Sequence, residues 1–440
     1  MIFLLFFPFT YAQKAVSDVI HPEWSYNLSI YEVNIRQYTE EGTFNAFSEH
    51  LPALKELGAG ILWFMPVHPI GEKNRKGSLG SYYSVKDYKR INPEFGTLED
   101  FKKLVENAHD NGFYVIIDWV ANHTSWDHKW TEEYPEFYNK DDEGNFLPPV
   151  PDWSDVIDLN YDNHLLWDHM LDAMKFWVEE CDIDGFRCDV AEMVPIEFWN
   201  YVRDELEKIK PVFMLAEGEN PGLHEHAFDM TYSWTFHHLL NDYADGDKTV
   251  TDLVNYFSKD AEEYPENAFR MLFTSNHDEN SWNGTVFERL GSAAETFAVL
   301  TFLAPGMPLI YSGQESGLGK RLNFFEKDPI EWKDHPFRIV YSKLNFLKRS
   351  NSALFNGEKG GKLIILNTSN PEQTMAFLRD NADNKIIAVF NLSDTEQKLS
   401  INGDFPPGSY TDYFSGMNYN LNDVLSFKMK PWTYKILLKD

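Results

Sequence analysis

Short runs of β-branched and aromatic residues alternate, along most of the chain, with longer stretches whose apolar residues recur at helical spacing. The run FYVIID at 113–118 is almost continuously apolar, as expected for a strand buried on both faces. Runs of similar character predict further strands at 29–35, 60–66, 184–189, 212–217, 227–230, 270–275 and 308–311.

The stretches between these runs predict helices at 44–57, 98–111, 165–180, 196–208, within 239–257, and at 293–303. Asn111-Gly112 supplies a stop signal for the second of them. Eight strands that alternate with helices over about 310 residues are typical of a parallel β/α architecture. We therefore predict an α/β fold in which residues 22–345 form a (β/α)₈ TIM barrel.

Two segments depart from the alternating pattern. Residues 123–160 are polar and loop-like, which predicts a small inserted subdomain after the third strand. Beyond residue 350 the pattern changes to short alternating strands such as KIIAVFNL, separated by turn signals such as Asn402-Gly403. Residues 351–440 are therefore predicted to form an all-β C-terminal domain, an antiparallel β-sandwich.

The first residues, MIFLLFFPFTYA, form an apolar run of about a dozen residues, which is too short to span a bilayer as a helix. Small residues near Ala12 favour a signal peptide over 1–13 and hence export to the periplasm or the medium, although no Lys or Arg precedes the run. No later segment is long and apolar enough to predict a membrane span.

Composition narrows the classes of partner. The net charge of −30 argues against binding nucleic acid or anionic membrane surfaces, because both favour Lys and Arg. The apolar fraction of 43% is sufficient for a large core. The two cysteines, Cys181 and Cys188, exclude a disulfide scaffold and a cysteine-rich zinc site, and we expect them to be buried free thiols. The oligomeric state is left open.

Polar residues gather at the ends of the predicted strands, where the active site of a β/α barrel forms. Four of the eight strands are followed or ended by such residues: Asp118 with Asn122-His123, Arg187 with Asp189, Glu217, and His277-Asp278. So many carboxylates in one place are costly to bury and are expected at functional sites. Two carboxyl groups, one ionised and one protonated, are what glycoside hydrolysis requires.

Arg187 and Asp189 are two residues apart, so both side chains point to the same side of their strand, into the barrel. A neighbouring guanidinium keeps a carboxylate ionised and therefore nucleophilic. Cys188 between them must point outward to the helices, which makes it a packing residue.

With these motifs in their order along the chain, the sequence resembles the α-amylase superfamily, glycoside hydrolase family 13, over about residues 22–440. The motifs that carry the resemblance are Asp118-Trp-Val-Ala-Asn122-His123, Gly185-Phe-Arg187-Cys-Asp189, Leu-Ala-Glu217, Asn276-His277-Asp278, Asp158-Leu-Asn160 and Tyr311-Ser-Gly-Gln-Glu315.

The resemblance implies an enzyme with a nucleophile at Asp189, a general acid/base at Glu217 and a third carboxylate, Asp278, that grips sugar hydroxyls. It implies substrate-binding positions at Tyr83, Asp118, His123, Arg187 and His277, with Arg187 orienting Asp189. Such enzymes are retaining glycoside hydrolases that cleave α-1,4-glucosidic bonds in starch, glycogen or maltodextrins through a covalent glycosyl–enzyme intermediate. They need no organic cofactor.

Calcium is a further implication of the resemblance. The side chains of Asn122 and Asp158 and the backbone carbonyl of Met193 match the positions that hold a Ca²⁺ ion in α-amylases, and oxygen ligands of this kind suit the ion. The alternative is that Asn122 and Asp158 only brace loops.

Two departures bear on specificity. Glu192-Met193 stand where α-amylases usually carry Lys-His, so that the run DVAEM is closer to neopullulanases and cyclomaltodextrinases. Glu217 is followed by Gly218-Glu219-Asn220 instead of the common tryptophan-containing pair. A neopullulanase-like or cyclomaltodextrinase-like hydrolase and an α-glucan transglycosylase therefore remain alternatives. A non-catalytic glucan-binding relative is a remote one, because all three carboxylates are present.

Overall fold

The computed structural model describes residues 16–403, 405–421 and 425–440, so the predicted signal peptide at 1–13 lies outside the described part of the chain. Its centre is a closed barrel of parallel strands in the order β1-β10-β9-β8-β7-β6-β3-β2. The strands are β1 (Ile30–Val33), β2 (Ile61–Phe64), β3 (Tyr114–Trp119), β6 (Gly185–Cys188), β7 (Phe213–Ala216), β8 (Met230–Tyr232), β9 (Phe269–Leu272) and β10 (Met307–Tyr311). The predicted (β/α)₈ barrel is confirmed, and β8 starts where the predicted strand 227–230 ends.

The alternation of side chains along each strand separates two cores. One core lies inside the barrel and contains the inward-pointing side chains of Ile30, Ile61 and Ile116. The other, larger core lies between the barrel and its helices and contains the outward-pointing side chains of Phe186 and Cys188. Cys188 is a buried free thiol that faces outward, as predicted, and Cys181 is also free and buried.

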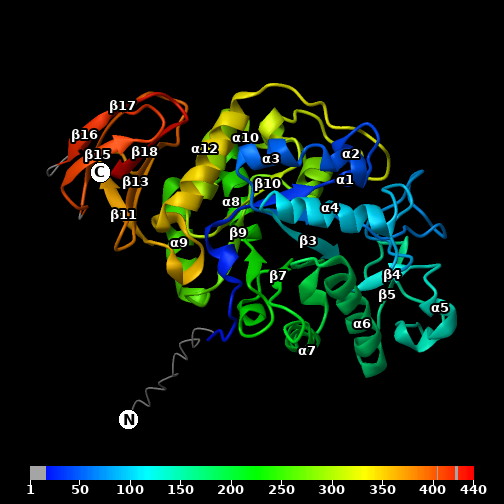
Figure 1. Cartoon of the computed structure of the whole chain (residues 1–440). Coiled ribbons are helices and arrows are strands. Elements are labelled where there is room, and N and C mark those ends of the chain that lie inside the picture. Colours follow the sequence, from blue (N-terminus) through cyan, green and yellow to red (C-terminus); the bar gives the residue numbers. More distant parts are fainter. Residues whose placement is uncertain (1–15, 404, 422–424) are drawn as a thin grey trace, which may run out of the picture.

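Helices surround the barrel on its outer side (Figure 1). The longer ones are α4 (Leu98–Asp110), α6 (His164–Cys181), α7 (Ile196–Leu206), α8 (Trp234–Asp245), α9 (Val250–Glu263), α11 (Ala294–Leu303) and α12 (Pro336–Ser350). The last of them was not predicted from the sequence. Within the described ranges, no helix combines the length and the apolar character that a membrane crossing demands.

Two predicted helices are each broken in the structure. The stretch 44–57 forms α2 (Phe44–Ser48) and α3 (Leu51–Leu57), because Pro52 has no N–H and its ring excludes a continuous helix through the preceding turn. The helix predicted within 239–257 is divided between α8 and α9 at Gly246, whose φ of +88° suits glycine at a helix end.

The excursion predicted at 123–160 is present and contains β4 (His123–Ser125), α5 (Trp130–Glu133) and β5 (Val156–Asp158). β4 and β5 pair antiparallel, with His123 opposite Asp158. A second long connection, residues 65–97 between β2 and α4, was not singled out from the sequence. Figure 1 places the β4–β5 pair and α5 on the side of the barrel away from the C-terminal domain.

The C-terminal domain is an antiparallel sheet in the order β16-β15-β18-β13-β12-β11-β14-β17. Its strands are β11 (Lys362–Thr368), β12 (Thr374–Asp380), β13 (Lys385–Asn391), β14 (Gln397–Asn402), β15 (Gly408–Asp412), β16 (Asn418–Leu421), β17 (Leu425–Met429) and β18 (Thr433–Lys439). β11 pairs with β12 through its first residues and with β14 through its last, and residues of β14 and β17 share one core with those of β12 and β13. The sheet therefore folds over into two facing layers, as a sandwich does.

Both faces of β12 are buried, which explains how this domain attaches to the barrel. Ala376 and Leu378 point into the domain's own core, whereas Met375 and Phe377 belong to the core shared with the barrel helices. Arg379 adds a hydrogen bond from Nη1 to the carbonyl of Leu303, 2.7 Å away. Figure 1 shows the domain beside α9 and α12.

Candidate active site

The ends of three neighbouring strands bring three carboxyl groups onto one guanidinium. Arg187 comes from β6, next to Asp118 of β3 in register. Its Nη1 lies 2.8 Å from Asp118 Oδ1 and 2.8 Å from Asp189 Oδ1, and its Nη2 lies 2.8 Å from Glu217 Oε2. The Arg187 side chain has no exposed surface. The structure thus brings together the residues predicted from strands three, four and five.

Asp118 is fully buried, and both of its carboxylate oxygens are occupied by protein donors. Oδ1 faces Arg187, while Oδ2 accepts hydrogen bonds from Trp63 Nε1 at 3.2 Å and from the Tyr83 hydroxyl at 3.0 Å. A carboxylate with this many donors and no exposed surface fixes its neighbours in place.

His277 joins the fourth carboxylate to the same cluster. Its Nδ1 lies 2.5 Å from Glu32 Oε1, and its Nε2 lies 2.7 Å from the Tyr83 hydroxyl and 3.3 Å from Asp278 Oδ2. Burial lowers the pKa of His277, but Asp278 and Glu32 outweigh it and hold that pKa well above its usual value. The imidazole is therefore positively charged between two acids.

The catalytic candidates differ in the direction and size of their pKa shifts. Burial raises the pKa of Glu217 to about 7, against the lowering effect of Arg187. Burial likewise raises the pKa of Asp189 to about 6, again opposed by Arg187. Burial also acts on Asp278, yet His277 lowers its pKa below the ordinary value. Of these three candidates, Asp189 and Asp278 are thus the carboxylates near neutral pH, and Glu217 is the one that retains its proton more readily.

Asp278 is the most accessible of the three, with 36% of its side chain exposed, against 10% for Asp189 and 14% for Glu217. Its charge raises the pKa values of both Asp189 and Glu217, so all three act on one another. The three predicted carboxylates, far apart in the sequence, therefore belong to one electrostatic unit.

The residue after Asp189 has an unusual backbone. Val190 adopts φ +37° and ψ +48°, a left-handed conformation that a β-branched residue enters only at a cost of about 1–3 kcal/mol. In this conformation its N–H donates to Glu217 Oε2 at 2.8 Å. The strained residue therefore lies directly after Asp189 and contacts Glu217.

The remaining predicted sugar-binding residues lie at the rim. His123, at the start of β4, is buried, and burial lowers its pKa to about 3, so its ring is neutral. Trp153 lies against it with ring centroids 5.5 Å apart. Tyr83 comes from the long connection 65–97, and its ring is nearly parallel to that of His277, with centroids 5.4 Å apart.

Several residues of the cluster were not predicted from the sequence. Glu32 in β1 and Trp63 in β2 point inward, and Tyr232 of β8 accepts a hydrogen bond from Arg187 Nε at 3.1 Å. A lone acid inside the apolar strand IYEV was the available signal for Glu32. Phe324 and Trp282 continue the aromatic wall beyond Tyr83, and no spacing rule connects them to it.

Two of the predicted calcium ligands, Asn122 and Asp158, make hydrogen bonds within the protein. Asp158 is the only carboxylate among them, and its Oδ2 already accepts a hydrogen bond of 2.6 Å from Asn139. The amide of Asn122 lies 3.3 Å from His123 Nδ1. Across the described ranges, no group of three or more His, Cys, Asp or Glu side chains could hold a metal ion. Calcium usually takes six to eight oxygens, of which these three residues would supply three, and no catalytic step is assigned to a metal.

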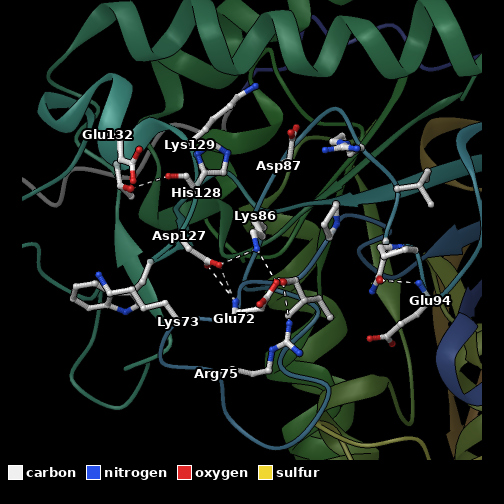
Figure 2. A pocket seen from close by; sticks show the side chains of 18 of the residues that line it. Glu72, Lys73, Arg75, Lys86, Asp87, Glu94, Asp127, His128, Lys129 and Glu132 are labelled. Carbon is white, nitrogen blue, oxygen red and sulfur yellow. Dashed lines mark hydrogen bonds and ion pairs between the residues drawn. The ribbon is translucent and has the colours of Figure 1, made fainter.

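A separate charged groove of about 860 Å³ lies between the connection 65–97 and the insertion (Figure 2). None of the predicted catalytic or sugar-binding residues lines it. At its centre Lys86 Nζ lies 2.9 Å from Glu72 Oε1 and 3.1 Å from Asp127 Oδ2. Figure 2 shows these three side chains pointing toward one another. The groove was not predicted from the sequence.

Comparisons with known proteins identify the family of the chain. The family model of the alpha amylase catalytic domain matches residues 23–149 and 150–336, which is well over half of the chain. The chain belongs to the α-amylase family. The model of the maltogenic amylase C-terminal domain matches residues 363–436, within the predicted all-β domain.

Individual relatives of this α-amylase family member are distant. The solved structure of a maltogenic alpha-amylase from Thermotoga neapolitana has a TM-score of 0.86 and 30% identity, covering 94% of this chain and 98% of that one. An alpha-amylase from Lactobacillus plantarum has a TM-score of 0.84 and 31% identity, covering 94% and 99%. Alpha-amylase MalA of Haloarcula japonica is 30% identical over 73% of this chain, which spans only about half (48%) of that relative's length.

Proposed function

We propose that the protein is a retaining glycoside hydrolase that cleaves α-1,4-glucosidic bonds in starch, glycogen or maltodextrins. The observation that carries the proposal is the pair of carboxyl groups, Asp189 and Glu217, on one buried guanidinium. Two neighbouring carboxyl groups are the arrangement that glycoside hydrolysis uses, one as nucleophile and the other as acid.

In the first step the Asp189 carboxylate attacks the anomeric carbon while Glu217 gives its proton to the glycosidic oxygen, and the leaving glucan departs. In the second step the Glu217 carboxylate takes a proton from water, which attacks the same carbon and releases Asp189. Arg187 holds both acids in place, and Asp278 and the charged His277 bind sugar hydroxyls.

Product length and acceptor are the finer part of the proposal. The names of relatives include a maltogenic alpha-amylase, a cyclomaltodextrinase and a maltosyltransferase. These names support a maltose-forming or cyclomaltodextrin-opening hydrolase and a transglycosylase as second candidates, since the same glycosyl–enzyme can pass its sugar to water or to another glucan.

A product profile on starch, pullulan and cyclodextrin separates these candidates, with maltoheptaose as the test of transfer. For the hydrolase we expect shorter maltodextrins from the first time points, released with the α configuration in an NMR time course. Longer oligomers that accumulate early would favour the transglycosylase, and β products would overturn the retaining mechanism.

Export and calcium are also proposals. The apolar start of the chain supports a cleaved signal peptide, and the mass of the mature N-terminus checks it. Oxygen ligands at Asn122, Asp158 and Met193 are the residues that would hold Ca²⁺. A calcium ion bound to the folded state alone would raise the Tm in CaCl₂ above that in EDTA, and an unchanged Tm would remove calcium from the account.

A further inference from the structure

The segment 190–193, directly after Asp189, makes three kinds of contact with the chain that carries Glu217. The N–H of Val190 donates to Glu217 Oε2 at 2.8 Å. The N–H of Ala191 donates to the backbone carbonyl of Glu217 at 3.0 Å. The carboxylate of Glu192 accepts hydrogen bonds at Oε1 from the N–H groups of Glu219 at 2.5 Å and Asn220 at 2.6 Å.

The two oxygens of Glu217 have different surroundings. Oε2 faces both the N–H of Val190 and the Arg187 guanidinium, whose Nη2 is 2.8 Å away. Oε1 has no protein donor or acceptor among the residues that the structure describes, and the side chain is partly open. A hydrogen on Oε2 would point at groups that already carry hydrogens, so a neutral Glu217 keeps its hydrogen on Oε1.

Gly218 shows how closely Glu192 lies against the loop behind Glu217. A Cβ added at residue 218 would lie 2.6 Å from Glu192 Cγ and 2.8 Å from its Oε1. On its other side the loop is held by Glu219, whose Oε1 lies 3.0 Å from Arg270 Nη2. The sequence departures at Glu192 and at Gly218-Glu219-Asn220 are therefore the two halves of one contact.

We propose that segment 190–193 positions Glu217 so that its Oε1 delivers the catalytic proton, with Glu192 as the positioning residue that fixes the loop 218–220 behind it. The inference rests on the proposed role of Glu217 as acid/base. In the step concerned, the proton moves from Oε1 to the glycosidic oxygen, the bond from the anomeric carbon to that oxygen breaks as Asp189 bonds to the same carbon, and the leaving glucan departs with the proton. The negative charge that Asp189 loses then lies on Glu217, between Val190 and Arg187.

Leaving-group dependence tests the proposal. A glucan leaving group needs the proton, whereas fluoride leaves without it, so we compare maltoheptaose with α-maltotriosyl fluoride. Glu192→Ala should lower kcat/KM for maltoheptaose by about tenfold or more and that for the fluoride by less than about threefold, because only protonation loses its geometry. Glu192→Gln retains an acceptor oxygen and should restore most of the loss.

Two further variants serve as a control and as a second way to disrupt the contact between Glu192 and the loop 218–220. Glu197→Ala removes an exposed acid on α7 with no ion pair among the described residues, and should behave as wild type. Gly218→Ala displaces Glu192 from the opposite side and should reproduce the split. Combining it with Glu192→Ala should add little, since both remove one contact. Gly218→Ala also provides the test if Glu192→Ala does not fold.

Equal losses on both substrates, a Glu192→Gln variant as impaired as Glu192→Ala, or a Glu192→Ala variant indistinguishable from Glu197→Ala would each overturn the proposal. Glu217→Gln separates this failure from a failure of the proposed function. If Glu217→Gln still hydrolyses maltoheptaose at the wild-type rate, the acid/base assignment itself is wrong.

Discussion

Two regions of this molecule are rich in charged side chains, and the pKa values of their acids shift in opposite directions. In the groove of Figure 2, Lys86 lies between Glu72 and Asp127, and the hydrogen bond from Lys86 lowers the pKa of Glu72. In the catalytic cluster, Asp118, Asp189 and Glu217 share one buried guanidinium, and burial raises the pKa of each. Two acids beside a partly solvated cation are ordinary surface, whereas three acids around a buried cation are poised for chemistry.

The largest difference between the regions should be in turnover. Asp189→Asn removes the proposed nucleophile and should lower kcat on maltoheptaose by about 10⁴-fold or more, whereas Asp127→Asn in the groove should leave kcat within about twofold. Reducing-sugar release measures both. Equal rates for Asp189→Asn and wild type would discard the assignment of this site.

The second-largest effect should come from replacing the shared cation, Arg187. Arg187→Lys retains the charge but loses the fork that reaches Asp189 and Glu217 from two nitrogens, so kcat should fall by about 10²-fold or more. Arg75→Lys, at an arginine that bonds backbone carbonyls beside the groove, is the matched control and should retain wild-type kcat. Steady-state kinetics on maltoheptaose distinguish the two, and a fully active Arg187→Lys would contradict the shared-cation account.

The pH dependence should show the raised pKa values directly. The proposed mechanism requires an ionised Asp189 and a protonated Glu217, so activity should fall as the pH drops through about 6 and as it rises through about 7. A kcat/KM profile from acid to alkaline pH measures both limbs. A profile that stays flat from pH 5 to pH 9 would contradict these shifts.

Stability should respond with opposite signs in the two regions. The folded-state pKa of Glu217 is raised, so its contribution to stability is fully present below its unfolded pKa of about 4.5 and is lost as the pH rises through about 7. Glu217→Gln should therefore be more stable than wild type at pH 8, by on the order of 1–3 kcal/mol, with no difference below pH 4. Glu72, whose pKa is lowered, contributes stability above its unfolded pKa that is lost as the pH falls.

Urea unfolding at the two pH values measures this gain, and Glu72→Gln is the control. A Glu217→Gln variant less stable than wild type at pH 8 would mean that the cluster is a structural ion network and not a strained functional site.

The smallest effect should come from the groove itself. Lys86→Met removes the cation that pairs with Glu72 and Asp127. Because exposed ion pairs contribute little to stability, the Tm should change by about 2 °C at most, and kcat should not change. Thermal unfolding and the maltoheptaose assay check this. A large loss of activity would link the groove to catalysis.

The sequence predicts those parts of the fold and of the site whose signals lie within one short stretch of the chain. The strands were recognised because each carries its own apolar pattern, and their order around the barrel then places Asp118, Asp189 and Glu217 on one rim. The breaks at Pro52 and Gly246 also have local causes, but the helical spacing of the apolar residues continues past both positions and does not indicate them.

Other features could not be predicted because they depend on contacts between distant segments. Glu32 meets His277 across the barrel, Phe324 lies along Tyr83, and the groove forms only where the connection 65–97 meets the insertion. The αL backbone of Val190, an outlier for its residue type, has no sequence signal at all.

The central claim is that Asp189 is the nucleophile of a two-step reaction in which Glu217 serves both steps. In Glu217→Gln treated with α-maltotriosyl fluoride, the first step needs no acid but the second lacks its base, so the glycosyl–enzyme should accumulate. Peptide mass spectrometry should then find the maltotriosyl group on Asp189. A label on any other carboxyl group, or a wild-type enzyme that releases β products and forms no adduct, would contradict the account.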